Sequence, residues 1–190
     1  MVRFFSTIMV SAILGAMALM MSVAKAGDDF KLNEDLAKRF TQSLAPVQAL
    51  AEVFEEEGVS SDLMIETRPA SGEEFKPYSS AVSALNEMHP KEYARLKSVV
   101  KQHGFTPTEW GVAGDRVIKA YLAVKMDEEN PGAIAQMKAI DKSMLAQMPA
   151  QYREQFERTL LMMSAVENTT EDDKKAIASV RDDLDHISDE

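Results

Sequence analysis

Apolar residues recur every three or four positions along most of the chain after residue 30, which is the period of an α-helix with one buried face. No stretch of useful length alternates apolar and polar residues as a half-buried strand would, and no internal repeat is visible. The pattern therefore predicts an all-α fold. The first helical run contains Leu36, Phe40, Leu44, Val47, Leu50 and Phe54.

Proline and glycine divide this pattern into segments. Pro46 lies within the first run, and because it lacks a backbone donor it predicts a kink or a split there. Gly58 follows three glutamates and predicts a left-handed cap at the end of that segment. Residues 59–76 lack the helical period, and we expect an irregular loop that serves as a plain connection or as a lid.

The clearest helix start in the sequence lies at residues 105–110. Thr106 is placed to cap the helix, Pro107 to occupy its first position, and Glu109 to complete a capping box. Phe105 and Trp110 flank the cap at the spacing of a hydrophobic staple. These signals agree, so a helix is predicted to begin at this point.

Five further helices are predicted from similar stripes and breaks, two of them beginning at Pro77 and Pro90. Together the segments predict a single-domain bundle of about six to eight short helices. The stripes of the last three contain Ile134, Met137, Ile140, Met144 and Met148; Tyr152, Phe156, Leu160, Met163 and Val166; and Ala176, Ile177, Val180, Leu184 and Ile187.

The helix that begins at Pro107 is apolar around nearly its whole circumference, which is typical of a buried, central helix. Gly111 and Gly114 in it would let a neighbouring helix approach closely. Asp115 and Arg116 stand in the middle of this apolar helix. Because adjacent helical residues point about 100° apart, the two side chains are not expected to pair with each other.

Asp115 and Arg116 therefore need partners elsewhere in the fold, since an unpaired buried charge is costly. One interpretation is structural: a tertiary salt bridge, or a cap for the end of another helix. The other is functional: a ligand anchor in a helix-lined pocket, with Trp110 and Tyr121 as pocket walls. The sequence leaves both open, and these four residues are the candidate ligand-binding site.

Residues 1–26 have the layout of a secretory signal peptide. Arg3 precedes a run without charge over residues 4–23, and residues 24–26 (Ala-Lys-Ala) fit a signal-peptidase site. The sequence thus predicts cleavage after Ala26 and a mature all-helical domain over residues 27–190. The alternative is an uncleaved segment that anchors the protein in a membrane, because the apolar run approaches the length of a membrane span.

Charge and cysteine content narrow the partners and the compartment. The chain carries a net charge of −10, and removal of Arg3 and Lys25 would leave −12. Such an acidic protein is not expected to bind nucleic acid or to remain inserted in a membrane after cleavage. There is no cysteine, so the domain is predicted to be stabilised by packing without disulfide bonds. Together with the signal-peptide layout, these features predict a location in the bacterial periplasm or outside the cell.

The sequence offers no catalytic, metal or cofactor site. His89, His103 and His186 lack a second histidine or cysteine at the spacing that zinc requires. Four aspartates between residues 182 and 189 lack the glycine and spacing of a calcium loop. No nucleophile elbow, phosphate-binding loop, dinucleotide fingerprint or HExxH motif is present, so we expect no enzyme.

The leading hypothesis is an exported, soluble, helical binding protein without catalytic activity, such as a chaperone-like protein of the periplasm. Its partner would be a polypeptide or an apolar small ligand, held in a helical groove or on an adaptable methionine-containing face. The alternative is a small-molecule sensor or carrier with a pocket around Trp110, Asp115, Arg116 and Tyr121. An enzyme of unrecognised type is the third hypothesis.

Overall fold

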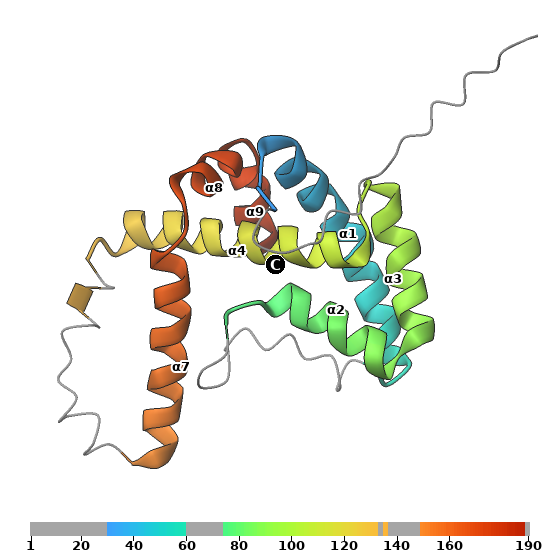
Figure 1. Ribbon diagram of the computed structural model, residues 1–190, viewed down its shortest axis with the longest axis horizontal. Coiled ribbons are helices and arrows are strands. Elements are labelled where there is room, and N and C mark those ends of the chain that lie inside the picture. The colour runs from blue at the N-terminus through green and yellow to red at the C-terminus, as the bar shows by residue number, and fades with distance from the viewer. Residues whose placement is uncertain (1–29, 60–73, 133–134, 137–148, 189–190) are drawn as a thin grey trace, which may run out of the picture.

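The computed structural model describes residues 30–59, 74–132, 135–136 and 149–188, and Figure 1 shows their arrangement. All regular structure in these ranges is helical, without a strand, which confirms the predicted all-α fold. The predicted signal peptide, residues 60–73 of the predicted loop and nearly all of the predicted helix over 134–148 lie outside the described residues. The helices are α1 (Glu34–Glu56), α2 (Pro77–Met88), α3 (Pro90–Gln102), α4 (Pro107–Glu129), α7 (Ala150–Glu167), α8 (Glu171–Ala176), the 3-10 helix η2 (Ala178–Val180) and α9 (Arg181–Ser188).

Helix α1 is continuous over 23 residues, so the split that Pro46 predicts does not occur. The carbonyl that Pro46 leaves without a donor belongs to Gln42, and both residues are exposed. Water can therefore bind that carbonyl, which lowers the cost of the proline within the helix. The start of α1 is also satisfied locally, because the Asn33 side chain accepts a hydrogen bond from the Leu36 N–H at 2.9 Å.

Two helices end at glycines in the left-handed region. Gly58 after α1 and Gly104 after α3 both have φ of +76°, which confirms the cap predicted at Gly58. In each case the residue after the glycine donates its N–H back across the last turn, from Val59 to Phe54 at 2.8 Å and from Phe105 to Val100 at 3.1 Å. This hydrogen-bond pattern turns the chain so that the apolar residue after the glycine is buried.

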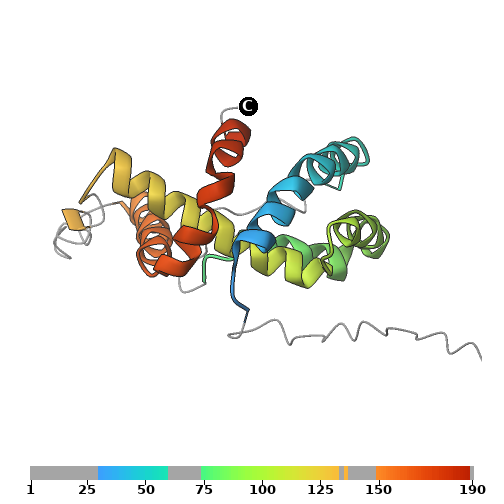
Figure 2. The ribbon, with the colours of Figure 1, turned by 90° about the horizontal axis from the view of Figure 1, so that it is seen from above.

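Helix α4 begins at the predicted position and lies at the centre of the fold. Thr106 and Glu109 form the predicted capping box, and Phe105 and Trp110 on either side of it are buried. Helices α1, α2, α3, α7 and α8 all pack against α4, and α1 and α9 extend from the same side of it (Figures 1 and 2). The central position predicted for this helix is therefore confirmed.

The N-terminus of α2 meets the middle of α4 at two glycines. A Cβ atom at Gly114 would lie 2.6 Å from Cγ of Tyr78 and 2.8 Å from Cε2 of Phe40, and one at Gly111 would lie 3.0 Å from Cα of Ser79. The glycines thus allow the predicted close approach. Trp110 completes the contact, because the rings of Phe40, Tyr78 and Trp110 lie with their centroids 5.4–5.5 Å apart.

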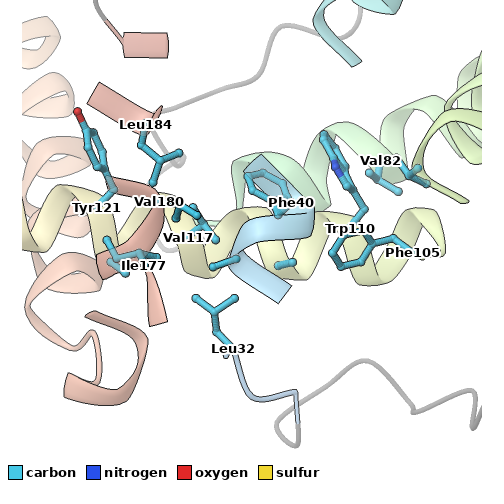
Figure 3. Close-up of a cluster of buried hydrophobic side chains, with 14 of the residues drawn as sticks. Leu32, Phe40, Val82, Phe105, Trp110, Val117, Tyr121, Ile177, Val180 and Leu184 are labelled. Carbon is cyan, nitrogen blue, oxygen red and sulfur yellow. The ribbon is translucent and has the colours of Figure 1, made fainter. Parts of the chain in front are cut away.

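The C-terminal residues form a second part of the core around α4. The single last helix predicted from the sequence is instead α8, η2 and α9 in succession. The tighter 3-10 turn brings Ile177 and Val180, three residues apart, onto one side, where they join the buried cluster that Figure 3 shows with Val117 and Leu184. Ile187, predicted to continue this buried stripe, is 39% exposed.

The apolar stripe predicted for α7 is only partly buried. Of the predicted stripe, Val166 is buried, whereas Tyr152 is 55% exposed and residues 156–165 are all half-buried. The reason is its position: α7 meets α4 near the C-terminal end of α4 and extends away from it (Figure 1). The side chains near residue 166 therefore reach the core and the earlier ones do not.

The close contact between α2 and α4 gives a test of the fold. In Gly114→Ala the new methyl group would overlap two aromatic rings, and overpacking of this kind costs about 1–3 kcal/mol. In Gly111→Ala the nearest atom is farther away, and the higher helix propensity of alanine offsets part of the strain. We expect chemical denaturation to show a larger loss of unfolding free energy for Gly114→Ala than for Gly111→Ala; the reverse order would contradict this packing.

Candidate functional site

The four candidate residues Trp110, Asp115, Arg116 and Tyr121 all project from α4. Because they lie at different angles around the helix, they reach different parts of the fold. Trp110 and Asp115 contact residues of α1 and α2, whereas Arg116 and Tyr121 contact residues of α8 and α9. The structure thus divides the candidate site into two pairs.

Asp115 caps the N-terminus of α2. The residue is 4% exposed, and its carboxylate accepts hydrogen bonds from the backbone N–H of Tyr78 at 2.8 Å and of Ser79 at 3.3 Å. The residue at the cap position of α2, Lys76, provides no side-chain cap of its own. A carboxylate from another helix therefore satisfies the free N–H groups of α2 and complements its dipole.

Burial changes the titration of this cap. It raises the pKa of the Asp115 carboxyl above its ordinary value of 3.8, while the hydrogen bonds from Ser79 and Tyr78 and the charge of Lys119 act in the opposite direction. Burial also raises the pKa of the Tyr78 hydroxyl, with the negative charge of Asp115 adding to the effect. Both shifts reflect the low polarity of the space between α2 and α4.

Arg116 joins α4 to α8 and to the segment before α1. Its Nη2 donates to both carboxylate oxygens of Asp173 at 3.0 and 2.8 Å, and its Nε donates to Oδ1 at 3.2 Å. The Asp173 side chain is only 8% exposed. The remaining nitrogen, Nη1, donates to the Phe30 carbonyl at 2.8 Å. The planar guanidinium thus binds two segments that are far apart in the sequence.

Trp110 and Tyr121 also direct their polar atoms to other parts of the chain. Nε1 of Trp110 donates to the Ser43 hydroxyl at 2.7 Å, and that hydroxyl donates to the Phe40 carbonyl at 2.6 Å. The Tyr121 hydroxyl donates to Asp185 at 2.8 Å. Its hydrogen bond and the nearby Lys125 ammonium hold the pKa of the Asp185 carboxyl below its ordinary value.

The two charges in the apolar helix therefore form the contacts that a structural role requires, a helix cap for Asp115 and a tertiary salt bridge for Arg116. The sequence does not identify their partners. Tyr78 and Ser79 lie 37 and 36 positions from Asp115, and Asp173 lies 57 positions from Arg116. Asp173 carries one local signal, since its place in the first turn of α8 suits an acidic residue, but that place does not predict Arg116.

Among the described residues, a shallow hollow along α2 has a volume of about 440 Å³. None of the four candidate residues lines it. Their use as a ligand site stays a prediction. The residues that line the hollow are Lys76, Ser79, Ser80, Ser83, Ala84, Glu87 and Met88.

Neither a metal centre nor a membrane span emerges from the part of the chain that the structure describes. Within it, no three histidine, aspartate or glutamate side chains lie close enough to hold a metal ion. No helix among the described residues has the length and apolarity needed to cross a membrane. Both findings concern the described ranges alone.

Comparison with known proteins yields no relative. No protein family matches the sequence, and neither a curated protein nor a solved structure matches it.

The cap on α2 can be tested with two substitutions at one position. Asp115→Asn keeps an oxygen acceptor, whereas Asp115→Ala leaves the N–H groups of Tyr78 and Ser79 without one. Because an unsatisfied donor in a buried place costs about 1–3 kcal/mol, we expect the alanine variant to be less stable than the asparagine variant by that amount. Urea denaturation measures the difference, and equal stabilities would show that the cap contributes nothing.

The raised pKa of Asp115 predicts a specific pH dependence. Since the folded-state pKa lies above the unfolded value, the native protein binds more protons, and the contribution of Asp115 to the unfolding free energy falls as the pH rises through that window. We therefore expect the stability of the wild type relative to Asp115→Asn to decline as the pH rises above the ordinary aspartate value of 3.8. If the difference in unfolding free energy between the two proteins does not change with pH, the pKa of Asp115 is not raised in the folded state.

Proposed function

We propose that this chain is an exported, non-catalytic helical protein that holds a partner polypeptide against the apolar side chains of α7. The observation that carries the proposal is that the apolar side chains of α7 are only partly covered, with Val166 the one buried residue of its predicted stripe. Residues 156–165 are all half-buried, and the helix packs mainly against one end of α4. Export is supported by the signal-peptide layout of residues 1–26.

The composition of this part of α7 suits adaptable binding. Its apolar side chains include Leu160 and Leu161, followed by Met162 and Met163. Methionine is flexible and polarizable, and it packs against partners of varied shape. Half-buried apolar side chains on a protruding helix lose further contact with water when a partner covers them, and this provides the driving force for binding.

The alternative, a small-molecule carrier around the four α4 residues, has less support. The polar atoms of Trp110, Asp115, Arg116 and Tyr121 already bond to other parts of the chain. A ligand there would have to replace these bonds, and each replaced bond would reduce the net affinity. The α7 surface requires no such exchange.

The proposal predicts that polar substitutions on α7 weaken client binding. In the double variant Met162→Gln and Met163→Gln, side chains of similar length lose their apolar character. We expect the affinity for a permanently unfolded, reduced client protein to fall about ten-fold, which corresponds to about 1.4 kcal/mol. Fluorescence anisotropy of the labelled client would measure the change, and circular dichroism would check that the helices remain folded.

The matched control is Met88→Gln, which changes an exposed methionine on α2. It should leave client binding within about two-fold of the wild type, because α2 is not part of the proposed surface. If the wild type binds no unfolded client, or if Met88→Gln weakens binding as much as the double variant does, the proposed function is wrong.

A further inference from the structure

The exposed side of α3 is basic, although the protein as a whole is acidic. The helix contains Lys91, Arg95, Lys97 and Lys101 against one acid, Glu92, which gives it a net charge of +3 in a chain of −10. All four cations are exposed, whereas Glu92 is half-buried. At about 100° per residue the four cations spread over the solvent side of the helix, opposite the buried Leu96 and Val100.

Three of these cations make no ion pair with any residue that the structure describes: Lys91, Lys97 and Lys101. The exception is Arg95, whose Nη1 lies 2.7 Å from Oε2 of Glu57, the C-cap of α1. Elsewhere in the described ranges, Lys38, Lys76, Lys125 and Lys174 each pair with an acid, whereas Lys31, Lys119 and Lys175 do not. These last three lie on different segments, so among the described helices α3 is the one with several unpaired lysines.

The arrangement is unfavourable for the helix itself. Lys91 and Arg95 are four residues apart, as are Lys97 and Lys101, and like charges at that spacing destabilise a helix. Where a helix places like charges four residues apart without a contact that compensates for their repulsion, the reason is often functional. The basic side of α3 is thus better explained by a partner than by the stability of α3.

We propose that the exposed cations of α3 form a docking surface for an acidic segment of a partner polypeptide. The remainder of the chain carries a net charge of −13, so on average it repels an anionic partner. Such a partner is steered to this one helix. Charge complementarity therefore determines the orientation as well as the site of docking.

The shape of the surface favours a polypeptide over a membrane or a nucleic acid. The basic strip is one helix wide, and carboxylates lie near it: Glu57, the C-cap of α1, pairs with Arg95, and the exposed Glu87 precedes Lys91 by four positions in the chain. A flat anionic membrane would meet these acids as well, whereas a single extended segment can follow the lysines alone. A nucleic acid, whose phosphates extend well beyond such a strip, would meet the surrounding acids too.

This surface is independent of α7. In Figure 1, α3 lies at the N-terminal end of α4 and α7 near the C-terminal end. Binding at α3 depends on charge and should weaken with salt, whereas binding at α7 depends on apolar contact and should not. One proposal can therefore fail while the other holds.

The test uses the purified protein and a fluorescent peptide of about ten consecutive glutamates as the acidic probe. At low ionic strength we expect saturable binding that disappears in roughly 1 M NaCl, where the Debye length is about 3 Å. The triple variant Lys91→Gln, Lys97→Gln and Lys101→Gln should bind at least about five-fold more weakly. It should remain folded, because the substitutions remove like-charge repulsion from α3.

The control variant changes the net charge by the same amount elsewhere, with Lys31→Gln, Lys38→Gln and Lys175→Gln at three exposed positions. Its affinity for the peptide should stay within about two-fold of the wild type. Equal loss in both variants, or no binding of the peptide by the wild type, would overturn the proposal. Binding is also measured with vesicles rich in phosphatidylglycerol and with a single-stranded oligonucleotide. If the protein binds either of these in place of the peptide, the proposal of an acidic polypeptide partner is wrong.

Discussion

The contact between the N-terminus of α2 and the middle of α4 is the constraint on which the rest of the fold depends. Two conditions are met at one place. Gly111 and Gly114 remove the side chains that would keep the helices apart, and Asp115 supplies the acceptor that the end of α2 lacks. Either condition alone would leave a costly defect, because a close approach without a cap buries free N–H groups, and a cap without the glycines cannot reach them.

This contact also positions α1. Tyr78, the first residue after the proline of α2, is held by Asp115 through its backbone and packs with its ring against Phe40 of α1 and Trp110 of α4. Trp110 in turn bonds to Ser43 of α1. Polar bonds and aromatic packing thus fix the same three helices, and a buried network of this kind favours one arrangement over near alternatives. On the other side of α4, Arg116 binds Asp173 and so holds α8.

The sequence predicts the local features of this fold well and its long-range partners poorly. Thr106 and Glu109 lie three residues apart, and Gly58 follows directly after its helix, so their roles can be predicted from neighbouring residues. Asp115 and Asp173 act on segments dozens of positions away, and no local pattern encodes those distances. The need for partners could be predicted because a buried charge is costly, but which residues supply them depends on the packing of the whole chain.

The same reasoning explains where periodicity misleads. A helical apolar stripe indicates that a face avoids water, but it does not say what covers that face. Phe40 of α1 is buried in the core of this chain, whereas the similar stripe of α7 reaches the core only at Val166. The fold covers the apolar side chains of α7 only partly, and it leaves the lysines of α3 without an ion pair among the described residues. Since the charged and aromatic groups of α4 already serve the fold, surfaces that the fold does not use are the stronger candidates for function.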